Sequence, residues 1–583
     1  MNKLDPKKAD TTSFRLWIGG AAGEGIAAAG QIFIKSCARS GLQVYAYNSY
    51  ESVIRGGHVL FRVEVGAQKP YLQPGSCDIL IALNQETIDI EGPKAERGIL
   101  FNSDRFKLDN AKLKAGAHAL GFPCNQLTGK PLMQNTAALG AAAFLAGLDI
   151  DVLVKLLRET FGKKTTTVIE ENMQAARAGH RYAENHFSDM PTRLAGDDRR
   201  RLVLSGNEAM AFGALAAGCK FFSAYPMTPA SPIMHWLAPR AAEHGVVFKQ
   251  TEDEIAAINM AIGASIAGAR AMTATSGGGF ALMTEALGLA GMIEAPLVVV
   301  EVQRAGPSTG LPTKSEQGDL FQVLGAGQGD YPKIVLAPTS VEDAFYIMGE
   351  AFNLAERFQM PVVVLSDLIL GEHRETVEDF DTGIPIDRGV WAKIPANGKN
   401  GFKRYALTPS GVSPRAVPGQ AGLVHVAATD EHDEKGCLIS DVHPDPTMRA
   451  LMMDKRMRKL EFAAKIMKPP TLEGPADAEL TLVTWGSSCG AARHAMRRLN
   501  QDGQNRVNVL PLRCLHPFPD KQILSILKGA RKVMALEANY TGQMCRLVRM
   551  ETGFDIARRW LQYDGEPFDP DAVIHHVEEA LND

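Results

Sequence analysis

The sequence lacks paired cysteines, long apolar runs and a strong excess of either charge. Eight cysteines stand without a single Cys-x-x-Cys pair, at positions 37, 77, 124, 219, 437, 489, 514 and 545. Zinc and iron–sulfur sites commonly use cysteines two residues apart, so this pattern argues against a metal centre in this chain. We expect most of these cysteines to be buried, reduced thiols.

Membrane and nucleic-acid partners are also disfavoured. The longest apolar runs, such as 295–302, are far too short to span a bilayer, and residues 1–10 are polar and charged. The 62 Lys and Arg residues are balanced by 66 Asp and Glu residues, which leaves no basic excess for nucleic acid or an anionic membrane. The sequence therefore predicts a cytoplasmic protein with neither kind of partner.

What is present is the composition of a large globular protein, with 583 residues of which 45% are hydrophobic and 22% charged. Residues 14–20 predict a strand, followed by a glycine-rich turn and a small-residue helix to about residue 39. This is a β-turn-α unit. Alternating strand and helix signals continue through this block, which predicts a first domain at 11–185 and a polar linker at 186–200.

A second alternation of strands and helices fills 201–370, with its first strand expected at 202–205. Glycine, proline and charged residues dominate 371–475, which predicts a long connection containing one helix near 448–466. Residues 432–436 are interpreted as a solvated loop, with contact to a partner chain as the alternative. A third α/β unit follows at 476–583, its first helix capped by Ser487 or Ser488. The predicted fold class is therefore α/β, with three α/β domains.

A proline-rich loop follows an apolar strand of the second domain. Prolines 226, 229 and 232 forbid a regular helix from Tyr225 to Thr228 and leave a stiff extended loop. Open α/β sheets build ligand sites at the carboxyl ends of their strands. Thr228 has two open interpretations: it caps the following helix, or its hydroxyl, with Ser231 as a neighbour, donates to a bound carboxylate or carbonyl.

An acidic cluster at 252–254 precedes an apolar, small-residue helix. Thr251 and Glu254 have the spacing of a capping box, which is a structural interpretation. The functional alternative is that one carboxyl points into a low-dielectric cleft, where burial raises its pKa and lets it donate a proton to a ring nitrogen. Both interpretations stay open.

Arg304 follows a strongly apolar strand and begins a loop rich in glycine and hydroxyl groups that ends at Lys314. A single arginine at a strand end is usually solvated. The composition of this loop also suits an anion held by guanidinium, ammonium and backbone N–H groups, such as a substrate carboxylate.

These motifs together resemble the alpha subunit of 2-oxoacid:ferredoxin oxidoreductases, most closely the 2-oxoglutarate type. The resemblance is based on the segments YPMTPASP, EDEIAAINMAIGAS, TATSGGG, VEVQRAGPSTGLPTKSEQGDL and LEANYTGQMCRL. GGAAGEGI and YESVIRGG near the N-terminus resemble the gamma domain of the same enzymes. The family implies a gamma-type domain, a pyrimidine-type thiamine diphosphate domain and a transketolase-C-terminal-like domain, in that order.

The resemblance implies a role for particular residues. Glu254, nine residues before Gly263, corresponds to the carboxylate on the aminopyrimidine ring of thiamine diphosphate, with Glu252 as the reserve candidate. Arg304 and Thr228 are implied to hold the substrate. The other implied contacts are Tyr225 and Pro226 to the cofactor, Ser231 and Lys314 to the substrate, and Gly20, Gly23, Gly25, Arg55 and Gly56 in the coenzyme A region.

The chain has no Gly-Asp-Gly motif followed by paired asparagines, which the family uses to hold Mg²⁺ and the cofactor diphosphate. Mg²⁺ and a [4Fe–4S] cluster are therefore expected on a beta subunit, in an assembly of two alpha and two beta chains. We expect the chain alone to be inactive. The glycine turn at 19–25 departs from a Gly-x-Gly-x-x-Gly fingerprint, which disfavours nicotinamide binding.

The implied reaction converts 2-oxoglutarate and coenzyme A to succinyl-CoA and CO₂ with reduction of ferredoxin. Pyruvate or a branched-chain 2-oxoacid is the alternative substrate, since a distal carboxylate needs a second cation from Lys314, His235 or a partner. A non-catalytic assembly scaffold is the alternative outside the enzyme class.

Overall fold

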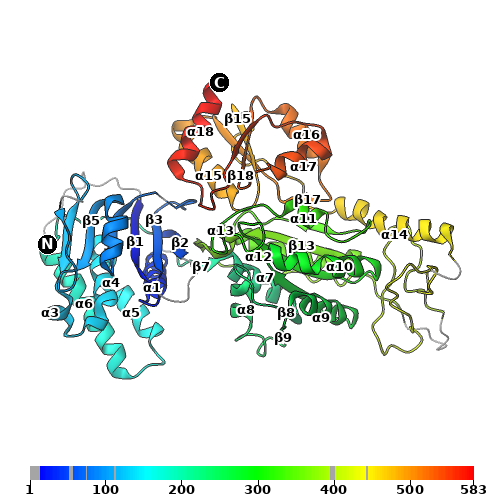
Figure 1. Ribbon diagram of the computed structural model, residues 1–583, viewed down its shortest axis with the longest axis horizontal. Helices are drawn as coiled ribbons and strands as arrows, with labels where there is room; N and C mark the ends of the chain where they lie inside the picture. The colour runs from blue at the N-terminus through cyan, green and yellow to red at the C-terminus, as the bar shows by residue number, and fades with distance from the viewer. Residues whose placement is uncertain are drawn as a thin grey trace. The chain divides into compact units, whose positions relative to one another are not determined.

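The computed structural model describes residues 13–50, 57–73, 75–110, 113–192, 194–197, 199–393, 401–440 and 444–583. The first of its two compact units contains the described residues up to Ser205, with Glu372–Asp379 and Pro567–Ala572. The second contains the described residues of Gly206–Gly371, Phe380–Glu566 and Val573–Asp583. Each unit combines β-sheet with helices (Figure 1), which confirms the predicted α/β class.

The first unit is built on an eight-stranded sheet in the order β6-β5-β4-β1-β3-β2-β14-β7. Its strands are β1 (Ser13–Ala21), β2 (Gln43–Tyr50), β3 (His58–Gly66), β4 (Cys77–Ala82), β5 (Ala95–Asn102), β6 (His118–Phe122), β7 (Leu202–Ser205) and β14 (Arg374–Val377). Its helices are α1 (Ile26–Arg39), α2 (Gln85–Glu91), α3 (Cys124–Thr128), α4 (Gln134–Leu145), α5 (Ile150–Thr160) and α6 (Thr166–His186). The predicted β-turn-α unit is confirmed as β1 and α1.

Alternation along β1 sends side chains to the two faces of this sheet. Phe14, Leu16 and Ile18 join the core that contains apolar residues of α1 and α4, whereas Trp17 belongs to a separate cluster with Leu80. The parallel partner of β1 is β4, and its antiparallel partner is β3. Burial on both faces explains why the strand reads as an almost continuous apolar run.

Two strands depart from the predicted domain order. The sequence places residues 202–205 in the second domain, but β7 pairs antiparallel with β14 at the edge of the first unit's sheet. β14 comes from the stretch predicted as a connection, and it also pairs with β2. Local periodicity carries no signal for pairing between segments so far apart in sequence. The boundaries at 11–185, 186–200, 201–370, 371–475 and 476–583 stay predictions.

The second unit contains a seven-stranded sheet in the order β17-β12-β13-β11-β10-β8-β9, parallel except for β17. Its strands are β8 (Phe221–Ala224), β9 (Val247–Gln250), β10 (Ala271–Thr275), β11 (Leu297–Gln303), β12 (Ile334–Leu336), β13 (Pro361–Asp367) and β17 (Cys514–His516). The accompanying helices are α7 (Gly206–Ala216), α8 (Ser231–Leu237), α9 (Glu254–Ile266), α10 (Gly277–Met292), α11 (Leu320–Leu324), α12 (Val341–Phe358) and α13 (Leu368–Glu372).

A smaller parallel sheet in the order β16-β15-β18-β19 completes the second unit. Its elements are β15 (Leu480–Thr484), α15 (Ser488–Leu499), β16 (Val507–Pro511), α16 (Asp520–Gly529), β18 (Val533–Glu537), α17 (Gln543–Thr552), β19 (Arg558–Leu561) and α18 (Pro570–Asn582). Ser487 occupies the N-cap position of α15 but makes no side-chain capping bond. Apolar residues of both sheets share one core, in which Trp485 packs with residues of β11 and β13.

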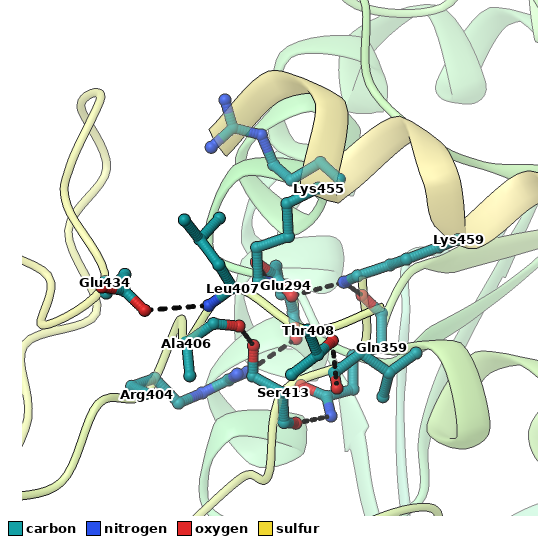
Figure 2. Close-up of polar contacts among 12 residues, drawn as sticks. Glu294, Gln359, Arg404, Ala406, Leu407, Thr408, Ser413, Glu434, Lys455 and Lys459 are labelled. Atoms are coloured by element: carbon teal, nitrogen blue, oxygen red, sulfur yellow. Dashed lines mark hydrogen bonds and ion pairs between the residues drawn. The ribbon is translucent and has the colours of Figure 1, made fainter. Parts of the chain in front are cut away.

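The long connection contains helix α14 (Pro446–Ala464), close to the predicted 448–466. Figure 2 shows how this helix is held: Lys455 Nζ donates to Glu294 Oε1 at 2.5 Å, and Lys459 contacts the other carboxylate oxygen. All three side chains are fully buried. The prediction of a solvated loop at 432–436 is wrong for His432, which is fully buried with its ring centroid 4.1 Å from that of Tyr405.

Candidate functional site

Four loops of the second unit leave the same edge of the seven-stranded sheet. β8, β10 and β11 are parallel, so their carboxyl ends lie together and lead into Tyr225, Ser276 and Arg304. β9, parallel to β8, leads into Glu254 at the start of α9. The sheet therefore gathers the proline-rich loop, the acidic cluster and the arginine loop at one edge.

Glu254 is the first residue of α9, and its side chain is almost fully buried at 3% exposure. Its Oε1 atom has no hydrogen-bond partner among the described residues. Burial raises the pKa of this carboxyl, its backbone N–H opposes the shift, and the charge of Asp253 adds to it. A buried carboxyl with an unused oxygen and a raised pKa is equipped to hold a proton and donate it.

The predicted capping box is wrong, because Asp253 caps α9. Asp253 Oδ1 accepts the backbone N–H of Ala256 at 2.7 Å, while Thr251 Oγ1 donates to the carbonyl oxygen of Asp253 at 2.8 Å. Asp253 has the extended backbone conformation typical of an N-cap. Glu254 is consequently not used as a cap. The reserve candidate, Glu252, is exposed.

A glycine on α10 makes room for the Glu254 carboxyl. A Cβ atom on Gly279 would lie 2.6 Å from Glu254 Oε1 and 2.2 Å from Thr275 Oγ1. Thr275 Oγ1 in turn lies 3.9 Å from Met227 Sδ in the proline-rich loop. Glu254, Thr275 and Met227 therefore share one neighbourhood.

Arg304 and Thr228 are brought into direct contact. Arg304 Nη1 donates a hydrogen bond to the carbonyl oxygen of Thr228 at 2.8 Å. The Arg304 side chain has no ion pair within the part of the chain that the structure describes, and burial lowers its pKa while Asp319 opposes that shift. Thr228 is not a helix cap, because α8 begins at Ser231 with Ala230 in the N-cap position.

The remaining predicted contacts have varied surroundings. The ammonium of Lys314 pairs with Glu566, and the backbone N–H of Ser315 donates to the carbonyl oxygen of Gly565 at 3.1 Å. Lys314 is therefore already neutralised by a carboxylate. Tyr225, Pro226 and His235 are exposed, and Ser231 is the first residue of α8.

The sequence interpretation missed two acidic residues near Arg304 in sequence, Glu301 and Asp319. Glu301 lies in β11 with 0% exposure, and its pKa is raised well above the ordinary value by burial, Asp319 and Asp367. Burial raises the pKa of Asp319 to about 6, an effect opposed by Glu301 and Arg304. The available signal was an acidic residue inside an apolar parallel strand, where an unpaired charge is costly.

In the first unit, the glycine turn between β1 and α1 contains Gly20, Gly23 and Gly25. Gly23 and Gly25 have φ values of 94° and 79°, which favour glycine. Glu24 Oε2 accepts the backbone N–H of Ala21 at 2.8 Å, and a Cβ atom on Gly20 would lie 2.7 Å from it. Arg55 and Gly56 lie outside the described residues.

Within the described ranges, no cluster of three or more His, Cys, Asp or Glu side chains is arranged to hold a metal ion. Seven cysteines are buried and Cys437 is exposed, and none forms a disulfide. None of the described helices combines the length and the apolar character needed to cross a membrane.

Known proteins resemble the chain over almost its whole length. The 2-oxoacid:ferredoxin oxidoreductase subunit alpha of Sulfolobus sp. is 32% identical, with 97% of this chain and 96% of the relative covered. The chain belongs to this family. Another relative, the 2-oxoglutarate oxidoreductase subunit KorA of Mycobacterium tuberculosis, is 31% identical, with 96% of this chain and 90% of the relative covered.

Domain families and a solved structure agree with membership among the 2-oxoacid:ferredoxin oxidoreductases. Residues 15–182 match pyruvate ferredoxin/flavodoxin oxidoreductase, 212–443 its thiamine diphosphate-binding family, and 478–571 pyruvate:ferredoxin oxidoreductase core domain II. A 2-oxoglutarate:ferredoxin oxidoreductase from Magnetococcus marinus superposes with a TM-score of 0.90 at 34% identity, covering 98% of this chain and 100% of that one. The family resemblance predicted from the motifs is confirmed.

Proposed function

We propose that this chain is the alpha subunit of an enzyme that converts 2-oxoglutarate and coenzyme A to succinyl-CoA and CO₂ while reducing ferredoxin. The observation that carries the proposal is the buried Glu254 carboxyl, with its unused Oε1, at the sheet edge where Arg304 meets Thr228. The choice of 2-oxoglutarate is supported by the relative from M. tuberculosis and by the M. marinus structure, described with 2-oxoglutarate, coenzyme A and succinyl-CoA bound.

The residues at this edge fit thiamine diphosphate. Glu254 Oε1 lacks a hydrogen-bond partner among the described residues, and Gly279 keeps the space beside it open. Tyr225 and Pro226 are the further candidates for cofactor contact. When bound, the cofactor supplies the electron sink that lets a 2-oxoacid lose CO₂. Glu254 holds a proton at its carboxyl and donates it to a nitrogen of the aminopyrimidine ring, a task that its raised pKa favours.

The substrate's carboxylate is held by Arg304. The carbonyl oxygen of Thr228 fixes one guanidinium nitrogen, so the remaining N–H groups of the planar guanidinium can donate to a carboxylate. The Thr228 hydroxyl makes no hydrogen bond among the described residues, which leaves it able to donate to the 2-oxo oxygen. Ser231 is its neighbour. Lys314 can bind a distal carboxylate only if it leaves Glu566.

The other components of the reaction are assigned to the first unit and to a partner. Coenzyme A is expected at the glycine turn with Gly20, Gly23 and Gly25, together with Arg55 and Gly56. Mg²⁺ and a [4Fe–4S] cluster are expected on a beta subunit, in an assembly of two alpha and two beta chains. Ferredoxin then accepts the electrons from the complex.

The first test is viologen reduction by the chain co-purified with its beta subunit, supplied with thiamine diphosphate, Mg²⁺ and coenzyme A. We expect the complex to reduce viologen with 2-oxoglutarate, and we expect the alpha chain alone to show no activity. The matched domain families are named for pyruvate. Preferential activity with pyruvate or with a branched-chain 2-oxoacid would change the assigned substrate but leave the enzyme class unchanged. An intact, cofactor-loaded complex inert toward every 2-oxoacid would favour the assembly scaffold.

A further inference from the structure

Two acidic residues accompany the proposed substrate-binding arginine: Glu301 on the strand that leads into it, and Asp319, whose backbone N–H is bonded to the residue before it, Gln303. Glu301 is fully buried in β11, three residues before Arg304. Neither of its carboxyl oxygens has a hydrogen-bond partner among the described residues, and the charges that act on it, those of Asp319 and Asp367, are both acidic. A buried carboxyl among other acids is stable only when it keeps its proton.

Asp319 is held at the sheet edge by its backbone. Its N–H donates to Gln303 Oε1 at 3.0 Å, and Gln303 Nε2 donates to the carbonyl oxygen of Ser366 at 3.0 Å. The Asp319 carboxyl lies against the start of α10, since a Cβ atom on Gly277 would be 2.3 Å from Asp319 Oδ2. The position of this carboxyl is therefore fixed by two strands and a helix.

Asp319 is also the acidic group that acts on Arg304. The two side chains form no ion pair within 4.0 Å in the described part of the chain, and the guanidinium donates to the Thr228 carbonyl oxygen instead. An incoming 2-oxoacid carboxylate and an ionised Asp319 would then share the one positive charge of Arg304. Like charges at such a site disfavour each other.

We propose that Asp319 is a positioning residue that takes up one proton when the substrate carboxylate binds Arg304, with Glu301 keeping the other proton of the pair. The inference rests on the proposed function. The proton comes from solvent, the substrate stays ionised, and the proton returns to solvent when the carboxylate leaves or is lost as CO₂. With Asp319 neutral, the Arg304 charge is available to the substrate alone.

The groups facing Asp319 determine the pH range of this effect. They are Glu301 from β11, Arg304 from the following loop, and Glu316, whose own raised pKa is due first to burial. Burial raises the pKa of Asp319 to about 6. Above pH 6 the free enzyme has an ionised Asp319, so binding requires proton uptake and KM for the 2-oxoacid rises with pH. The slope approaches tenfold per pH unit.

The test uses the assembled, cofactor-loaded complex and its D319N variant. We expect the KM of the wild type for 2-oxoglutarate to rise at least tenfold between pH 6.5 and 8.5, and that of D319N to stay within about threefold. Calorimetric titration with oxalylglycine, an unreactive isostere of 2-oxoglutarate, in buffers of different ionisation enthalpy should give close to one proton taken up per ligand at pH 7.5 for the wild type. D319N should give close to none.

Three further variants distinguish a positioning role of Asp319 from a merely structural one. D330N removes an exposed carboxyl in the connection after α11 and should match the wild type in KM profile and proton count. E301A removes the neighbouring side chain that lowers the pKa of Asp319, so the rise in KM should begin at higher pH, whereas E301Q keeps a polar side chain there and the original onset. A D319N profile that follows the wild type, or no proton uptake by the wild type, overturns this inference. Absence of turnover with every 2-oxoacid would instead overturn the proposed function.

Discussion

Arg304 and Thr228 lie 76 residues apart in sequence, yet the guanidinium of one donates a 2.8 Å hydrogen bond to the carbonyl oxygen of the other. Their loops follow β11 and β8, which flank β10 in the parallel sheet. The contact uses a backbone acceptor, so it orients the arginine without neutralising it. Arg304 is therefore a half-buried guanidinium whose positive charge is not neutralised by this contact and can bind an anion.

Replacing Arg304 by alanine should weaken use of the 2-oxoacid strongly. A hydrogen bond to a charged group contributes about 1.5–3 kcal/mol, which corresponds to roughly a 10- to 100-fold loss in kcat/KM. Steady-state viologen reduction by the assembled complex measures it. Arg549→Ala, which removes an exposed arginine 3.7 Å from Asp555, is the matched control. Equal losses in both variants would contradict a role of Arg304 in substrate binding.

Replacing Glu254 by glutamine should nearly abolish turnover, because the amide cannot transfer a proton at the buried Oε1 position. General acid–base groups typically contribute about 10²- to 10⁴-fold. The same change at the exposed Glu252 should leave the rate within about twofold. Single-turnover decarboxylation of labelled 2-oxoacid distinguishes the two. If E252Q is the inactive variant, the roles assigned to these two residues are exchanged.

The same Glu254→Gln change should stabilise the folded chain at neutral pH. The pKa of Glu254 is raised above its ordinary 4.5 in the folded chain. The folded state is therefore destabilised as the pH rises and Glu254 ionises, whereas a glutamine at this position does not ionise. The melting temperature of E254Q should exceed that of the wild type at pH 8, and the difference should shrink toward pH 4.5. A difference that is constant with pH would mean that ionisation of Glu254 has no energetic cost.

The sequence predicted the elements with strong local signals and missed those decided by distant contacts. β11 was predicted because parallel strands buried on both faces read as apolar runs, but Glu301 within it was overlooked. Thr251, Asp253 and Thr228 all have capping chemistry, and only packing decides that Asp253 caps α9. The pairing of β7 with β14 has no local signal. Nothing in the local sequence around Lys314 indicates that it pairs with Glu566, 252 residues further along the chain.

Gly279→Ala should impair the site, whereas Gly278→Ala in the same helical turn should not. A Cβ atom at 279 would come within 2.2 Å of Thr275 Oγ1 and 2.6 Å of Glu254 Oε1, but at 278 no atom lies within 4 Å. Overpacking costs about 1–3 kcal/mol, while glycine to alanine in an exposed helix gains up to about 1 kcal/mol. We expect G279A to lose most activity and some stability, and G278A to melt slightly higher. Indistinguishable variants would show that Glu254 is not confined by Gly279.

Replacing Glu294 by glutamine should destabilise the docking of α14. The change leaves Lys455 and Lys459 fully buried without their carboxylate, and removing one partner of a buried ion pair costs about 3–5 kcal/mol. Glu434→Gln, which breaks the partly exposed pair with Lys403, should cost at most about 1 kcal/mol. Denaturant unfolding and limited proteolysis of residues 401–466 measure both.

The acid dependence of the Glu294 variant provides an independent check on this prediction. Burial opposes ionisation of Glu294, but the nearby Lys455, Lys459 and Arg404 lower its pKa below 4.5. The stability that the ionised carboxylate contributes is therefore present above pH 4.5 and is lost as the pH falls through the folded pKa. The difference between E294Q and the wild type should narrow in acid. A gap that stays constant down to pH 3 would show that packing of the side chain, and not its charge, secures α14.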